Sequence, residues 1–220
     1  VVMRQIVVVA LVILVGLFAV ACGEPEPEGP PTFTEYPPVA VEPIRSYSVI
    51  LSTNMGRMTF KLLPEEALMA VNSFVFLVGQ GLYDGMTFYR LVPGVLTETG
   101  DPTGAGSGNA GYTYEAEPPQ RPYNKGSLVM GRDDSTNTNG SRFFIVLDDL
   151  TESELAAGHT VFGHLKVDHL PSARTLDKIS SVEVGVGPSG EVNVPQEAIE
   201  ILEAKITESC LPTMGIYNRC

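Results

Sequence analysis

The stretch FYRLVPGVLTETGD, residues 88–101, decides how this sequence is interpreted. It places one arginine, Arg90, between aromatic residues and a Pro-Gly turn, and one carboxylate, Glu98, among small or apolar neighbours. The stretch contains nothing typical of a nucleophile or a metal site. Its function therefore has to be inferred from the segments around it.

The surrounding sequence predicts many short strands and few helices. Residues 46–63 carry two alternating apolar runs around a Gly-containing turn, which indicates a hairpin. Apolar residues at helical spacing predict a helix in residues 65–81 and a second one over 172–179. Further strands are expected within residues 86–92, 126–132, 141–147 and 159–165, whereas 191–208 fits a strand or a helix. This pattern favours a closed or nearly closed β-barrel with helices capping its ends.

The first residues have the layout of a secretory signal. One cation, Arg4, precedes an apolar run over residues 6–20, which is short for a membrane span of about 20 residues. Small residues then precede Cys22, as in the lipobox of bacterial lipoproteins, although Ala19 stands where leucine is usual. We expect a signal peptide over 1–21 and lipidation of Cys22; the alternative is an uncleaved membrane anchor.

A segment rich in proline and glutamate follows. Residues 24–43 contain five Glu, seven Pro and no Lys or Arg. Such a composition buries too little apolar surface to fold, so residues 22–45 are predicted to form a disordered tether. This tether would hold the folded domain away from the membrane.

Overall composition limits the class of partner. A formal net charge of −12 with only 14 Lys and Arg argues against a nucleic-acid partner and favours a soluble monomer. Cys210 and Cys220 lie close to each other near the C-terminus, and a disulfide between them is plausible in an oxidising compartment.

Four motifs occur together in this order: VNSFVFLVGQGLYDGMTFYRLVPG (71–94), GDPTGAGSGNAGY (100–112), NTNGSRFFIVL (137–147) and HTVFGHL (159–165). They resemble the cyclophilin family of peptidyl-prolyl cis-trans isomerases, especially its bacterial members. The resemblance implies a mainly β fold, a closed eight-stranded antiparallel β-barrel capped by two α-helices. A shallow groove on one face would bind proline-containing segments. The implied domain covers residues 46–205 and leaves 206–220 as a C-terminal tail.

The reaction that this resemblance implies needs few polar groups. An X-Pro bond isomerises through a twisted amide with a barrier of about 20 kcal/mol, and no covalent bond is made or broken. The catalyst holds the flanks, seats the ring and stabilises the twisted amide. Arg90 stands where the family has its catalytic arginine. A lone arginine of this kind would otherwise be interpreted as a surface residue.

Other positions are assigned to substrate binding only through the resemblance. Phe144 falls in the family's proline pocket with Leu155 and His159 on its rim, and the backbone at Gly131 and Arg132 falls where an extended peptide pairs edge-on. The remaining substrate-binding positions all depart from the family pattern: Tyr89 for histidine, Val95 for a large aromatic, Leu96 for methionine, and Glu98 and Arg142 for glutamines.

The two glutamine positions lead to a specific hypothesis. A carboxylate or a guanidinium alone at the rim of an apolar groove would be unfavourable, so Glu98 and Arg142 are expected to form an ion pair. Glu98 could also draw Arg90 into a bidentate fork, which would either orient it or hold it away from substrate.

The sequence as a whole favours an exported, lipid-anchored isomerase that acts on X-Pro bonds without a metal or a cofactor. A different class remains open, a proline-segment binding module with weak or no turnover. A third possibility is a structural lipoprotein that uses the barrel as a scaffold. Retained Arg90, Phe144 and His159 favour the enzyme, whereas Val95, Glu98 and Arg142 favour the binding module.

Overall fold

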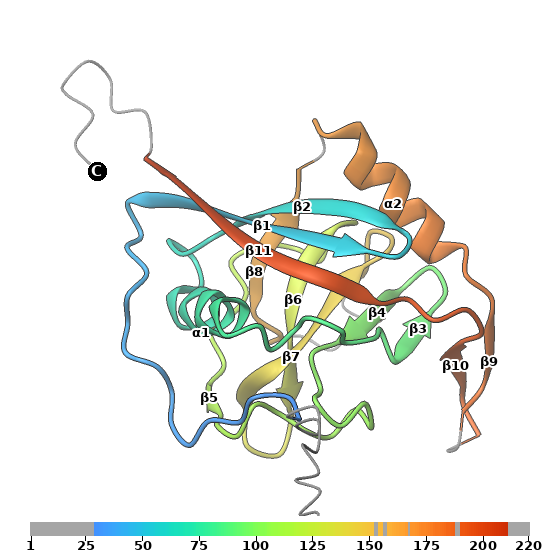
Figure 1. Ribbon diagram of the computed structural model, residues 1–220, viewed down its shortest axis with the longest axis horizontal. Coiled ribbons are helices and arrows are strands. Elements are labelled where there is room, and N and C mark those ends of the chain that lie inside the picture. Colours follow the sequence, from blue (N-terminus) through green and yellow to red (C-terminus); the bar gives the residue numbers. More distant parts are fainter. Residues whose placement is uncertain (1–28, 152–153, 156–157, 167, 188–189, 211–220) are drawn as a thin grey trace, which may run out of the picture.

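The computed structural model describes residues 29–151, 154–155, 158–166, 168–187 and 190–210. One curled antiparallel sheet with two helices makes up most of this part of the chain (Figure 1). The strands are β1 (Arg45–Thr53), β2 (Gly56–Leu62), β3 (Arg90–Val92), β4 (Leu96–Thr99), β5 (Tyr114–Glu115), β6 (Ser127–Asp133), β7 (Thr138–Val146), β8 (Val161–Leu165), β9 (Val184–Val186), β10 (Val192–Pro195) and β11 (Ile201–Cys210), and the helices are α1 (Leu68–Gly79) and α2 (Leu170–Ser180).

The strand order explains how distant segments meet at one face. The main sheet runs β11-β1-β2-β8-β6-β7-β4-β3, and β5 pairs with β7 off this path. β1 and β2 form the expected hairpin. β9 and β10 form a separate two-stranded hairpin, which lies beside β3 at the right of Figure 1. The predicted mainly β, antiparallel fold with two helices is confirmed.

The two edges of the main sheet approach each other through backbone bonds outside the ladders. Phe88 N donates to Ile199 O at 2.8 Å, and Ile201 N donates to Met86 O at 2.8 Å. A bridge between Thr87 and Glu200 lies between them. These contacts join the segment before β3 to the start of β11, so the sheet curls most of the way round its core.

Aromatic rings fill the space between α1 and the sheet. Phe74 of α1 is fully buried, and its ring lies 5.0 to 5.3 Å from the rings of Tyr83, Phe143 and Phe162. Glu117, on a loop, accepts backbone hydrogen bonds from Met69 and Ala70 at 3.0 and 2.9 Å. A carboxylate at this end satisfies N–H groups that the helix leaves unpaired and opposes its dipole.

The N-terminal part of the described chain is packed against the domain. The ring of Phe33 lies 5.0 Å from Phe76 and 6.5 Å from Tyr112, and Tyr36 donates its hydroxyl to Met69 O at 2.8 Å. We call residues 33–41 the strap. The expectation of a disordered tether over 22–45 is therefore wrong for the strap, because its aromatic rings find an apolar surface on α1.

Asn72 of α1 fixes the strap. Its side chain is 2% exposed and accepts from the backbone N–H groups of Ala40 and Val41 at 2.8 and 3.2 Å. Its amide nitrogen donates to Tyr36 Oη at 3.1 Å. One buried amide thus satisfies backbone groups that the proline-rich strap cannot pair with itself.

The domain also ends later than expected. β11 continues to Cys210 and pairs with β1 over its length, as in the partnership of Arg45 with Cys210. Residues 206–210 are therefore part of the sheet, and the expected tail over 206–220 is wrong for them. The expected signal peptide, the lipidation of Cys22 and the disulfide to Cys220 lie outside the described residues. Among the residues that are described, no helix is long and apolar enough to cross a membrane.

Candidate active site

A row of side chains crosses the outer face of four strands. Backbone pairing aligns Arg90 of β3 with Glu98 of β4, Glu98 with Phe144 of β7, and Phe144 with Val129 of β6. Partners directly opposite in antiparallel strands point to the same face. The register alone therefore places a guanidinium, a carboxylate and an aromatic ring side by side.

The Phe144 end of this row is an apolar seat. A cluster separate from the main core forms there, and several of its members are partly open to solvent. Predicted residues Val95, Leu96, Phe144 and Leu155 all belong to it, which brings them together as expected. The cluster consists of Leu96, Tyr123, Val129, Phe144, Val146 and Val161, with Val92, Val95, Leu150 and Leu155 packed against it.

Tyr123 is a member of the seat that sequence reasoning missed. It is 6% exposed, and its hydroxyl accepts from His159 N at 3.1 Å and donates to His159 O at 3.3 Å. Tyr123 thus supplies a second aromatic ring and holds the backbone of the rim histidine. The PYN turn at residues 122–124 gave no signal of this role, because the contact spans 36 positions.

His159 is the polar wall of the seat. Its ring lies edge-on to Phe144 at 5.5 Å, and its Nδ1 lies 3.1 Å from the carbonyl oxygen of Met130. A carbonyl can only accept, so Nδ1 carries the proton. Burial is the main reason that the pKa of His159 is lowered from its usual value. The ring is therefore neutral at physiological pH and adds no charge to the seat.

Glu98 is the centre of the polar half of the row. It is 8% exposed, and its two oxygens take different partners: Oε2 lies 3.3 Å from Arg90 Nη1, and Oε1 lies 3.4 Å from Arg142 Nη1. The expected Glu98–Arg142 ion pair is present. The suggested bidentate fork with Arg90 is absent from this part of the described chain, since Glu98 offers Arg90 only one oxygen.

The two arginines differ in how much of each is open to a ligand. Arg142 Nη1 also donates to Gly106 O at 2.7 Å, which fixes it against the loop of residues 101–108. The side chain of Arg90 is 39% exposed, compared with 22% for Arg142. Arg90 is the guanidinium with more surface open to a ligand.

Tyr89 supports the loop rather than the seat. A Cβ on Gly106 would lie 3.3 Å from its ring, so the loop passes close over the ring face. Its hydroxyl is buried beside Glu98 and Arg142 and makes no hydrogen bond of good geometry among the described atoms. Burial, and then the Glu98 carboxylate, raise the pKa of Tyr89 far above its usual value, so the hydroxyl stays neutral.

Gly131 and Arg132 lie where β6 loses β8 as a partner while it stays paired with β7. The β6–β8 ladder ends at Val129, and the β6–β7 register shifts between Met130 and Arg132. A Cβ added to Gly131 would lie 2.9 Å from the Cβ of Arg142, so a glycine is needed for the two strands to pack this closely. A bulge and an ended ladder leave an edge that an extended peptide can pair with.

The side chain of Arg132 is occupied elsewhere. Its Nε and Nη2 donate to one oxygen of Asp134 at 2.9 and 2.6 Å, and it lies against Gly158. Only the backbone of Arg132 is therefore offered to a ligand, as the sequence interpretation required.

The described side chains do not gather into a cluster of metal ligands. Within the described ranges, no three side chains of the His, Cys, Asp or Glu type come together as ligands. The expectation that the protein uses no metal and no cofactor stays a prediction. An apolar seat, an adjacent guanidinium and an open strand edge on one face of a curled antiparallel sheet together suit an extended polypeptide as a ligand.

The chain belongs to the cyclophilin-type peptidyl-prolyl cis-trans isomerase family. The family described as "Cyclophilin type peptidyl-prolyl cis-trans isomerase/CLD" matches residues 48–206, which include the whole row and the seat.

Curated relatives from bacteria support the same assignment. A putative peptidyl-prolyl cis-trans isomerase of Staphylococcus epidermidis is 33% identical over 70% of this chain and 91% of its own length. A peptidyl-prolyl cis-trans isomerase of Synechococcus elongatus is 35% identical over 61% of this chain and 94% of its own. A putative bifunctional phosphatase/peptidyl-prolyl cis-trans isomerase of Streptococcus pyogenes is 34% identical over 77% of this chain, which spans 42% of that relative's length.

Solved structures share the fold. A cyclophilin type isomerase of Cryptosporidium parvum superposes with a TM-score of 0.64 at 28% identity, covering 74% of this chain and 98% of its own. The same protein, crystallised in the presence of the dipeptide Ala-Pro, gives a TM-score of 0.63.

Proposed function

We propose that this chain accelerates cis-trans isomerisation of X-Pro bonds in polypeptides. The observation that carries the proposal is the row from Arg90 through Glu98 to Phe144. In this row only Glu98 separates the Arg90 cation from the apolar seat. A proline ring in the seat would present its amide to Arg90. The seat fixes the ring and the edge at Gly131 fixes the preceding backbone.

Arg90 supplies the electrostatic part of catalysis. When the X-Pro bond twists, amide resonance is lost and the charge distribution of the amide changes. A guanidinium already held in place stabilises that state without reorganising at the moment of reaction. Glu98 pairs with Arg90 and Arg142, and the Tyr89 hydroxyl lies beside Glu98 and Arg142. We assign Glu98 the role of a positioning residue.

Turnover of a proline peptide tests this function. We expect the purified chain to isomerise an Ala-Ala-Pro-Ala peptide, followed by exchange in NMR spectra, and we expect Arg90→Ala to reduce kcat/KM strongly. Turnover that is unaffected by Arg90→Ala would contradict the proposed role of the row.

A second function of a different class is favoured by two observations. Glu98 pairs Arg90 in the free protein, and Val95 provides a smaller wall to the seat than an aromatic residue would. Both would suit a module that binds proline segments with little turnover. Peptide binding by the chain, without catalysed exchange, is the result that would establish this alternative.

We also propose that the chain is exported and anchored through Cys22. The signal layout before Cys22 supports this. Because the strap is packed against the domain, it does not add to the distance between the domain and the membrane. Only residues 22–28 would separate the lipid from the described chain, and seven extended residues reach at most about 25 Å. The groove would therefore act close to the membrane. Loss of membrane association and of lipid labelling in Cys22→Ser tests the anchor.

The remaining partner proposals follow from charge. A net charge of −12 supports a monomer that does not bind nucleic acid. Size-exclusion chromatography with light scattering checks the monomer, and a mass of two chains would contradict it.

A further inference from the structure

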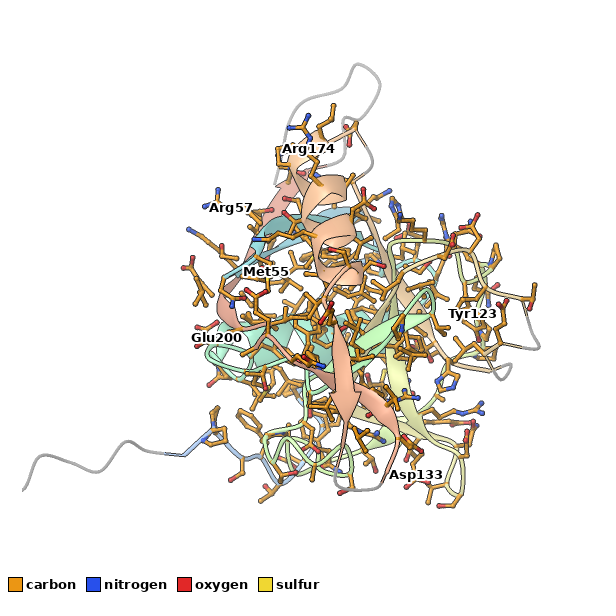
Figure 2. The ribbon with its side chains drawn as sticks, turned by 90° about the vertical axis from the view of Figure 1, so that its right-hand side faces the viewer. Met55, Arg57, Tyr123, Asp133, Arg174 and Glu200 are labelled. Carbon is orange, nitrogen blue, oxygen red and sulfur yellow. The ribbon has the colours of Figure 1, made fainter. Side chains whose placement is uncertain are left out.

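A second cavity adjoins the row at its Arg90 end. It has a volume of about 600 Å³ and lies between the row, the loop of residues 104–106 and the β9–β10 hairpin. Figure 2 views the domain from this side: the hairpin stands in front, Tyr123 of the apolar seat lies to the right, and Asp133 lies below. We call this space the hairpin pocket.

The hairpin has a defined position beside β3. Gly187 N donates to Glu191 O at 2.8 Å and Gly190 N donates to Gly187 O at 2.9 Å, which closes its turn. β10 packs against β3, and Gly187 lies against Val194. The turn therefore fixes the position of Glu191 in the lining of the pocket.

The hairpin pocket shares two residues with the row. Arg90 and Glu98 line both, so a polypeptide whose prolyl amide lies on Arg90 passes the mouth of the pocket. This step rests on the proposed function. A side chain close to the proline can then enter the pocket while the ring remains in the seat.

The walls suit a side chain with an apolar stem. Tyr89 and Val194 provide apolar surface, and Ala105 stands between glycines on the loop. The long methylene stems of lysine and arginine cover such surface while their charged ends reach water.

A carboxylate of the lining that lacks a cationic partner favours a cationic end. Glu98 is already placed between Arg90 and Arg142. Glu191 is exposed, accepts from Asn193 Nδ2 at 2.6 Å, and makes no ion pair with any described Lys or Arg. Arg90, Glu98 and Arg142 together keep one net positive charge, whereas Glu191 is a carboxylate of the lining that no described Lys or Arg pairs.

We propose that the hairpin pocket binds a lysine or arginine side chain of the substrate, within two residues of the proline, with its stem against Val194 and its charge at Glu191. The pocket gives the isomerase a preference for basic segments. Glu191 is then a specificity-determining residue that takes no part in the isomerisation itself.

Peptides that differ in one flanking residue test this proposal. In Ala-Ala-Pro-Ala-Ala, each alanine in turn is replaced by Lys, Gln or Glu, and kcat/KM is measured with the full chain. At one flanking position we expect Lys to exceed Glu by about three- to fivefold, with Gln between, as an exposed ion pair allows. The preference should shrink at 0.5 M salt, where exposed charges are screened.

Variants of the hairpin separate the pocket from general electrostatics. Glu191→Gln should abolish the preference and Glu191→Lys should reverse it. Glu183→Gln is the matched control, because Glu183 is an exposed carboxylate at the other end of the same hairpin, and it should keep the preference. A preference that survives Glu191→Gln, or a preference for Glu at every position, would overturn the proposal.

The outcome also separates this proposal from the proposed function. If the all-alanine peptide is not isomerised, the proposed function fails, and the dissociation constants of the same peptides decide about the pocket. Equal binding of Lys and Glu peptides would then overturn the pocket as well.

Discussion

Glu98 places one carboxylate oxygen 3.3 Å from a guanidinium nitrogen of Arg90 while its other oxygen faces Arg142 at 3.4 Å. Both distances exceed the 2.7–2.9 Å that is usual for a strong charge-assisted bond. Glu98 therefore faces two neighbouring cations at once, so the three groups keep one net positive charge, and the remaining N–H groups of Arg90 are left to a ligand. The three charges form one unit, and their substitutions should not be additive.

A double-mutant cycle on Glu98 and Arg142 tests this unit. Glu98→Gln leaves two guanidiniums facing each other, and Arg142→Gln leaves Glu98 to Arg90 alone, so each should lower kcat/KM by about 3- to 10-fold. The double variant should recover most of the activity, with a coupling energy of about 1 kcal/mol or more. Additive losses in measured kcat/KM would show that the residues act independently.

The depth of the apolar seat predicts a gain of activity. Val95 is partly exposed at the edge of the cluster around Phe144. Val95→Phe should add apolar contact of about 1 kcal/mol and lower KM for a proline peptide by about fivefold. Val39→Phe is the matched control, because Val39 is 55% exposed on the strap. An unchanged KM in Val95→Phe would mean that the ring does not lie there.

The strap predicts a stability effect without a catalytic one. Asn72→Ala leaves the N–H groups of Ala40 and Val41 without their acceptor, so the free energy of unfolding should fall by about 2 to 3 kcal/mol. Urea unfolding measures this, with Asn124→Ala as a control because Asn124 is exposed. Catalysis at low temperature should persist. An unfolding free energy equal to that of the unchanged chain would contradict the packed strap.

His159 predicts a loss of stability in acid. Its folded pKa lies below its usual value because the ring is buried, so the unfolded chain binds the proton more readily. Its contribution is complete above the ordinary pKa of about 6.5 and declines as the pH falls below it. His159→Asn cannot titrate and should lose less stability than the unchanged chain between pH 7.5 and 5.5. Equal losses in urea unfolding would contradict a buried neutral ring.

Much of this fold could be predicted because its elements are local. The hairpin over residues 46–63 and both helices follow from periodicity and turn residues. The positions of Arg90, Glu98 and Phe144 in one row follow from strand register once the motifs are aligned.

Other features depend on contacts that local composition does not encode. The strap resembles a disordered tether in composition, yet Phe33 and Tyr36 are held by rings and an amide more than 30 positions away. Tyr123 reaches the seat from a loop. The sequence predicts no element over β9 and leaves 191–208 open between a strand and a helix, because Val186 and Val192, which pair across the hairpin, are both exposed and their apolar pattern does not follow burial.

The most direct test of the central claim is the rate of X-Pro isomerisation by the purified chain beside Arg90→Ala, Arg90→Lys and the control Arg174→Ala. Arg174 is exposed on α2, at the top of Figure 2 and away from the row. We predict that Arg90→Ala lowers kcat/KM by about 100-fold or more, that Arg90→Lys recovers little, and that Arg174→Ala changes nothing. Full activity in Arg90→Ala would contradict the account.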